Sequence, residues 1–171
     1  MTGQDAAVAG APAAAPKRKK ASPLSRRGAA RLAAVQALYQ IELTDAEPPK
    51  VVAEFLRARL DPNGRDEETV VVWAYADRDF FQSIVFGATA ARATLDDAIN
   101  AAMTNDWRVA RLEPVLRAAL RAGGFEISGR LDVPTAAIVN EYVEVVRDFS
   151  SEDAPGFAHA VLDRLARVER G

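Results

Sequence analysis

The spacing of the apolar residues limits the fold of this chain more than any other feature. From Leu24 onward, apolar residues recur three, four and seven positions apart, which gives a helix one continuous apolar face. The first such stripe comprises Leu32, Val35, Tyr39 and Leu43. Later stripes start near residues 52, 81, 95, 112, 138 and 157, and turn-forming residues separate them. The sequence therefore predicts an all-α fold, a compact bundle of about six or seven helices.

The composition agrees with packed helices. Alanine supplies 35 of the 171 residues and aromatic residues only 7%, whereas a β-sandwich needs more β-branched and aromatic side chains. Residues 61–69 have the composition of a loop, and residues 70–73 suit either a strand or a helix. Short loops between the later stripes predict that consecutive helices run antiparallel.

Two local features lead to specific expectations about the later helices. Gly123 and Gly124 lie inside the fifth stripe, so either that helix kinks or another helix packs closely against it. Asp132 precedes Pro134 at a typical helix start, and its carboxylate is expected to cap the amide of Thr135.

Charge is distributed unevenly along the chain. The formal net charge is −2, yet seven basic residues and only one acidic residue lie within the first 31 positions. Residues 1–23 are rich in Ala and Pro and offer little to bury, so we expect a disordered basic tail followed by one helical domain, residues 24–171. The basic cluster at residues 17–20 fits either attraction to a polyanion or a tail that only aids solubility.

The residue inventory excludes most enzymatic chemistry. The chain has no Cys and a single His, His159, which excludes disulfides, thiolate nucleophiles and multi-histidine metal sites. It has no glycine-rich phosphate loop, and no apolar run is long enough to span a membrane. Glu141, Glu144 and Asp148 share a helix face that suits solvent better than metal binding. We therefore expect a cytoplasmic protein without catalytic residues, metal or cofactor.

Two arginines at the start of the first helix are the strongest candidates for binding. Arg27 and Arg31 are four residues apart, so they share one helix face. Guanidinium groups on a rigid helix bind phosphates through paired hydrogen bonds and stack on unpaired bases. We therefore assign both to RNA contact and expect their removal to leave the fold nearly intact. The competing interpretation is that they pair with acids such as Glu141 or Asp153 and only stabilise the helix.

Five short segments form a recognisable series along the chain. They are Arg26-Arg27 with Ala30-Arg31 and the run Val35-Gln36-Ala37-Leu38-Tyr39; Asp79-Phe80-Phe81 with Gly87; Leu120-Arg121 with Phe125-Glu126-Ile127; Asp132-Val133-Pro134 with Ile138-Val139-Asn140-Glu141 and Phe149; and Phe157 with Val161-Leu162-Asp163. In order and spacing, over roughly residues 25–168, the series resembles the NusB family of bacterial transcription antitermination factors.

The resemblance implies two packed helical bundles that bind boxA-type single-stranded RNA together with ribosomal protein S10. In the family, this pair joins other Nus factors and RNA polymerase and suppresses termination, notably during ribosomal RNA synthesis. The positions that match the family's RNA-binding segment are Arg26, Arg27 and Arg31, to which we add Lys19 and Lys20 of the tail. The positions that match contacts to RNA or S10 are Tyr39, Asp153 and Phe157. Some relatives dimerise through these surfaces, so a homodimer stays open.

Three positions depart from the family pattern. Gly28-Ala29 replace a denser arginine run, Leu116 replaces an acidic residue, and His159-Ala160 replace an Asn-Gly pair. Two other interpretations also stay open. One is the related RNA-binding module of ribosomal RNA cytosine methyltransferases, and the other is a helical protein–protein adaptor without RNA activity.

Overall fold

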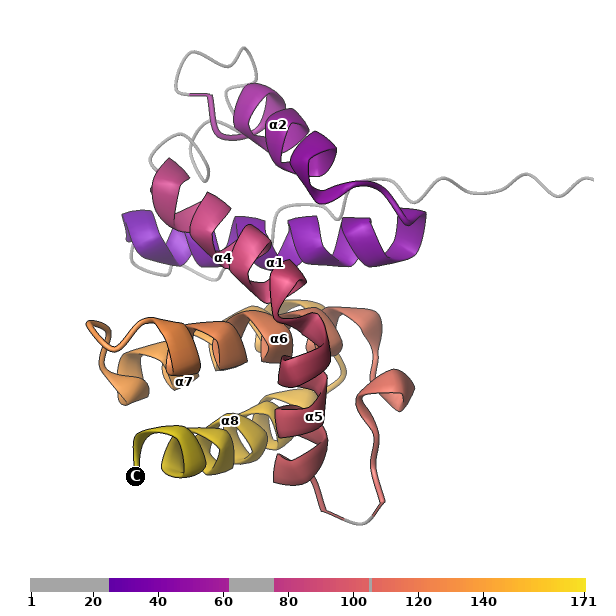
Figure 1. The fold of residues 1–171 in the computed structure, drawn as a ribbon, viewed down its shortest axis with the longest axis vertical. Coiled ribbons are helices and arrows are strands. Elements are labelled where there is room, and N and C mark those ends of the chain that lie inside the picture. The colour runs from indigo at the N-terminus through magenta and orange to yellow at the C-terminus, as the bar shows by residue number, and fades with distance from the viewer. Residues whose placement is uncertain (1–24, 62–75, 105) are drawn as a thin grey trace, which may run out of the picture.

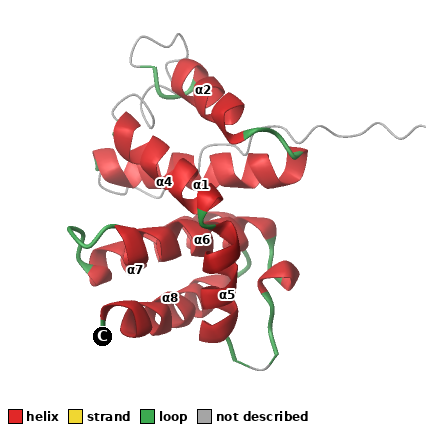
Figure 2. Ribbon diagram, viewed as in Figure 1, coloured by secondary structure: helices red, strands yellow, loops and turns green. Residues whose placement is uncertain are grey.

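The computed structural model of the protein describes residues 25–61, 76–104 and 106–171. Within these ranges it contains seven α-helices and one short 3-10 helix (Figure 2), which confirms the all-α prediction. The helices are α1 (Arg26–Thr44), α2 (Pro48–Ala58), α4 (Arg78–Ala90), α5 (Arg92–Ala102), η1 (Val109–Arg111), α6 (Pro114–Gly129), α7 (Thr135–Phe149) and α8 (Ala154–Arg170).

The helices form two groups that meet along α1 and α6 (Figure 1). One group comprises α1, α2 and α4, and the other comprises α5, α6, α7 and α8. α6, α7 and α8 run antiparallel, as the short loops between them predict. α1 lies at the boundary of its group, packed on α4 on one side and on α6 of the other group on the other side. Its two ends therefore reach opposite edges of the molecule, which sets the layout of the candidate site.

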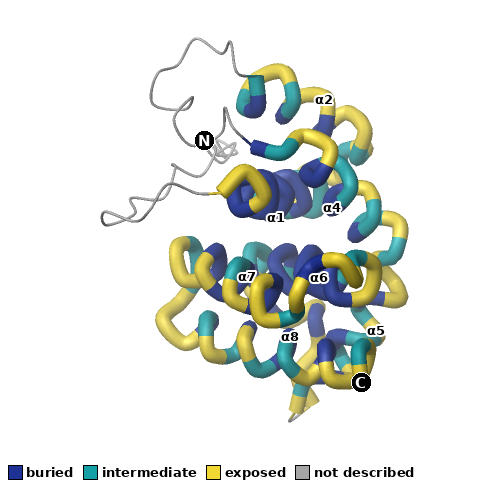
Figure 3. Tube along the Cα trace, turned by 90° about the vertical axis from the view of Figure 1, so that its left-hand side faces the viewer, coloured by how far each residue is buried: buried dark blue, intermediate teal, exposed yellow. Residues whose placement is uncertain are grey.

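Small side chains allow α1 to occupy this central position. The face it buries includes Ala30, Ala33, Ala34 and Ala37, all inaccessible to solvent. Alanine has a high helix propensity and a short side chain, so neighbouring helices can approach the axis of α1 closely. The buried residues form one continuous cluster through both groups (Figure 3).

The glycines of α6 allow close helix packing. α6 continues without interruption through Gly123 and Gly124. A Cβ added at Gly123 would lie 2.9 Å from Leu162 Cδ2, and one at Gly124 would lie 3.3 Å from Leu95 Cδ2. Gly87 of α4 has a similar role, because a Cβ there would overlap the ring of Phe125 on α6.

Side-chain caps begin two of the helices, and the cap expected at a third is absent. The Gly28 amide donates to Ser25 Oγ (2.9 Å) at α1, and the Phe80 amide donates to Asp77 Oδ1 (3.0 Å) at α4. The expected cap of α7 by Asp132 is wrong. The N-cap of α7 is Pro134, without a side-chain hydrogen bond, and the Asp132 carboxylate accepts hydrogen bonds from Arg130 instead.

Several sequence-based predictions fall outside the described residues. They concern the tail of residues 1–23, most of the loop at residues 61–69, and the ambiguous stretch at residues 70–73. Among the helices that the structure does describe, none is both long and apolar enough to cross a membrane.

Candidate nucleic-acid interface

The start of α1 presents two arginines to solvent. Arg26 and Arg27 are exposed, and they follow directly after the capping residue Ser25. The Arg27 guanidinium lies 4.7 Å from the centre of the Phe80 ring and 3.9 Å from an Asp132 oxygen. A helix N-terminus carries a partial positive charge, so this end of α1 favours anions even apart from the side chains.

Arg31, one turn further along α1, has a different environment. Its side chain is buried, and it donates two hydrogen bonds to the Glu126 carboxylate of α6, at 2.8 and 2.9 Å. The Tyr142 hydroxyl of α7 donates to the same carboxylate at 2.6 Å. The prediction that Arg31 projects from an exposed face is therefore wrong, because α6 and α7 cover α1 at this position. Arg31 acts as a buried link between three helices.

The electrostatics of this link favour a fixed arrangement. Burial disfavours the Arg31 cation, but hydrogen bonding and Coulombic attraction from Glu126 outweigh that effect and raise the pKa of Arg31. Burial, and then the charge of Glu126, raise the pKa of the Tyr142 phenol well above its usual value. Arg31 therefore stays charged and Tyr142 stays neutral near neutral pH, which preserves all three hydrogen bonds.

The α6–α7 loop brings a further arginine to the same edge of the molecule, at the left of Figure 1. Arg130 donates two hydrogen bonds of 3.0 Å to the Asp132 carboxylate, and its guanidinium lies 5.1 Å from the centre of the Phe80 ring. The hydrogen bonds to Arg130 lower the pKa of Asp132. Sequence reasoning missed Arg130, because nothing in its neighbourhood along the chain indicates that α1 lies beside it.

A second ionic network fixes the other end of α1. The Glu42 carboxylate accepts hydrogen bonds from Arg117 and Arg121 of α6, and Arg121 also donates to Asp96 of α5 at 2.7 and 2.9 Å. Arg117 additionally donates to backbone carbonyls around η1, including that of Leu112 at 2.9 Å. Burial opposes ionisation of Glu42, but the two arginines outweigh it and lower the pKa of that carboxyl. The network joins α1, α5, α6 and η1.

The remaining candidate contact residues lie away from the arginines. Tyr39 is half-buried on the C-terminal half of α1, and Asp153 is exposed just before α8. Phe157, on the first turns of α8, packs edge-on against Trp107 with ring centres 6.2 Å apart. Trp107 is 46% exposed, although sequence reasoning did not single it out. Trp107 and Phe157 thus form an aromatic pair that reaches the surface.

The structure explains two of the departures from the family pattern. Leu116 is buried, and so are Gly28 and Ala29. Substitutions at these three positions therefore change how the helices pack and do not directly change the exposed surface. His159 is exposed on α8, in keeping with a surface role.

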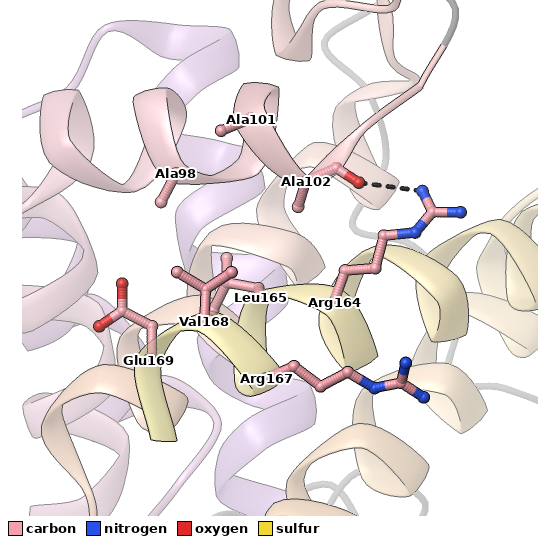
Figure 4. A pocket seen from close by; sticks show the side chains of 8 residues that line it. All are labelled: Ala98, Ala101, Ala102, Arg164, Leu165, Arg167, Val168 and Glu169. Carbon is pink, nitrogen blue, oxygen red and sulfur yellow. Dashed lines mark hydrogen bonds between the residues drawn. The ribbon is translucent and has the colours of Figure 1, made fainter. Parts of the chain in front are cut away.

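A groove between α5 and α8 is lined mainly by apolar side chains, including Ala98, Leu165 and Val168 (Figure 4). Arg164 closes one end of it with a 3.1 Å hydrogen bond to the Ala102 carbonyl. Among the described residues, no three His, Asp or Glu side chains gather as a metal ion would require.

Comparison with known proteins decides the family. The NusB family model matches residues 28–167. The chain is 46% identical over 147 residues to the transcription antitermination protein NusB of Brucella ovis, covering 86% of this chain and 84% of that one. It is 44% identical over 156 residues to that of Agrobacterium fabrum, covering 91% and 92%. The chain belongs to the NusB family. Its relatives are named antitermination proteins, so this is a family of transcription factors and not of enzymes.

Solved NusB structures share the fold. T. maritima NusB superimposes with a TM-score of 0.68 at 25% identity, covering 82% of this chain and 90% of that one. A structure described as the antitermination factors NusB and NusE in complex with double-stranded RNA gives a TM-score of 0.65 at 22% identity, covering 84% and 97%. NusB from Aquifex aeolicus gives 0.64 at 22% identity, covering 83% and 88%. These likenesses confirm the helical architecture.

Proposed function

We propose that this NusB-family protein binds boxA-type single-stranded RNA together with ribosomal protein S10 (NusE), and that it supports antitermination during ribosomal RNA transcription in the cytoplasm. Other Nus factors and RNA polymerase complete the proposed assembly. The observation that carries the proposal is the exposure of Arg26 and Arg27 at the start of α1, in a chain that belongs to this family.

The chemistry of this end of α1 suits an RNA backbone. Each guanidinium can donate two hydrogen bonds to a phosphate, and the planar group can also stack on an unpaired base. The backbone amides at the helix start add positive potential at the same place. Lys19 and Lys20, in the proposed tail of residues 1–23, would add long-range attraction without reading the base sequence.

The other candidate contact residues suit a different kind of contact. Tyr39 lies twelve residues beyond Arg27 on α1, about 18 Å along the helix axis at 1.5 Å per residue. Asp153, Phe157 and Trp107 supply one negative charge and an aromatic pair. We assign these residues to contact with S10 or with unpaired bases, since exposed aromatic rings serve both purposes.

A gel-shift assay with purified S10 tests the proposal. The probes are a boxA-like single strand and a scrambled strand of the same composition. Arg26→Ala/Arg27→Ala should weaken RNA binding by roughly 5- to 150-fold at near-physiological salt. It should also reduce the slope of log affinity against log salt by about 1.4, because two phosphate contacts are lost.

The matched control for this assay removes two exposed arginines elsewhere, Arg147 on α7 and Arg167 on α8. Arg147→Ala/Arg167→Ala changes the net charge equally and should bind RNA much as the wild type does. Equal RNA affinity in both double variants would contradict the proposal, and an S10 complex without RNA affinity would favour the protein–protein adaptor. Gel filtration of the protein alone and with S10 tests the homodimer.

A further inference from the structure

The edge of the molecule that holds Arg26 and Arg27 contains an arrangement of which the proposed function uses only Arg27. Three guanidinium groups surround the buried Phe80 ring, those of Arg27, Arg31 and Arg130, with carbon-to-ring-centre distances of 4.7, 5.0 and 5.1 Å. Arg31 is neutralised by Glu126 in the core. Arg27 and Arg130 remain near the surface, and each lies within 4 Å of an Asp132 oxygen.

Asp132 occupies the position of a bridging anion. Its two carboxylate oxygens accept from Arg130 Nε and Nη2, both at 3.0 Å, and one of them lies 3.9 Å from Arg27 Nη1. The side chain is 57% exposed, so solvent reaches the carboxylate. A phosphate carries a similar pair of oxygens, and guanidinium groups bind the two kinds of anion in the same geometry.

The loop that presents Arg130 and Asp132 is held firmly by α8. Arg170, near the end of that helix, donates to four backbone carbonyls, those of Glu126, Ile127, Arg130 and Val133, at 2.7 to 3.2 Å. It also reaches Thr135 Oγ1 at 3.2 Å. The backbone under Arg130 is therefore fixed, and the Arg130 side chain can exchange partners without rearrangement of the loop.

A second acid near Arg130, Asp77, already has a hydrogen-bond partner. Asp77 accepts the Phe80 amide as the cap of α4, so Asp132 is the carboxylate that competes for the surface arginines. We propose that Arg130 is an additional phosphate-binding residue of the RNA surface, and that Asp132 holds Arg27 and Arg130 in place until an RNA phosphate displaces it. This inference rests on the proposed RNA-binding function, and it adds a second segment of the chain to that surface.

Substitutions of Arg130 and of Asp132 act in opposite directions if the proposal holds. Arg130→Ala should weaken binding of boxA and scrambled RNA alike, roughly 3- to 10-fold, and should lower the salt slope by about 0.7, as one lost phosphate contact requires. Arg130→Lys should retain that slope while losing part of the affinity, because lysine keeps the charge without the paired donors. Asp132→Asn should strengthen RNA binding severalfold, because it removes the competing charge.

The Arg167–Asp163 pair on α8, with a 3.0 Å separation, supplies the matched control. Arg167→Ala and Asp163→Asn make the same charge changes outside the proposed RNA surface. They should leave RNA affinity within twofold of the wild type. Thermal melts check that every variant is folded.

The outcomes separate the two proposals. The inference is overturned if Arg130→Ala and Asp132→Asn match their α8 counterparts while Arg26→Ala/Arg27→Ala loses RNA binding; the proposed function then stands. It is also overturned if Asp132→Asn weakens binding, which would make Asp132 a support of the loop. Absence of RNA binding by the wild-type protein with S10 overturns both proposals.

Discussion

Two arginines one helical turn apart, Arg27 and Arg31, have opposite roles at the residue scale. Arg27 is 44% exposed in its side chain and forms one long ion pair, whereas Arg31 is buried against Glu126 and Tyr142. Their spacing on the helix predicts a shared face, and both do lie over the Phe80 ring. Exposure cannot be predicted in this way, because the partner of Arg31 is 95 residues away in the sequence.

The difference predicts different effects on stability. Arg31→Ala should lower the free energy of unfolding by about 3–5 kcal/mol, because it leaves the Glu126 carboxylate buried without a counter-charge. For a domain of this size that corresponds to a fall in melting temperature of roughly 6–20 °C. Arg27→Ala should cost at most about 1 kcal/mol, as for other exposed ion pairs. Thermal and urea unfolding of the two variants measure this contrast, and equal stabilities would refute the assigned role of Arg31.

At the scale of the elements, close contacts between helices depend on glycine where a side chain would collide. Gly87 of α4 faces the Phe125 ring of α6, and Gly123 of α6 faces Leu162 of α8. The sequence indicated that Gly123-Gly124 had either a packing or a bending role, and the structure shows the packing contacts. The periodicity alone could not decide, because the neighbour that fills the space belongs to another helix.

Substitution of Gly87 should reveal this contact. Gly87→Ala forces the Phe125 ring to move and should destabilise the fold by about 1–3 kcal/mol, despite the better helix propensity of alanine. Gly156, near the start of α8, has no atom within 4 Å of its would-be Cβ. Gly156→Ala should therefore be neutral or stabilising by up to about 1 kcal/mol. Urea unfolding compares the two variants. A stabilising effect of Gly87→Ala would show that the contact between α4 and α6 can accommodate a methyl group.

At the scale of the whole molecule, two surfaces of different chemistry lie apart. One gathers Arg26, Arg27 and Arg130 around the start of α1, and the other carries the Trp107–Phe157 pair at the start of α8. The sequence was sufficient to predict the helices, because helix periodicity is a local property. It also singled out Arg27, which is exposed, but it placed the buried Arg31 on the same exposed face. It was not sufficient to find Arg130 or Trp107, because both join the candidate surfaces through contacts between distant segments.

The contributions of the two surfaces to binding should depend differently on salt. A phosphate contact releases counterions when it forms, so its loss reduces the slope of log affinity against log salt, whereas the loss of an aromatic contact lowers affinity at every salt concentration. Trp107→Ala/Phe157→Ala should therefore weaken assembly of the RNA–S10 complex by about tenfold or more without changing its salt slope. Titrations at several salt concentrations, with the RNA and S10 each labelled in turn, separate the two effects and identify which partner the aromatic pair contacts. The double substitution does not change the charge of the protein. A reduced salt slope in this variant would therefore mean that the two surfaces do not act independently, because loss of the aromatic contact would also displace the arginines from the RNA.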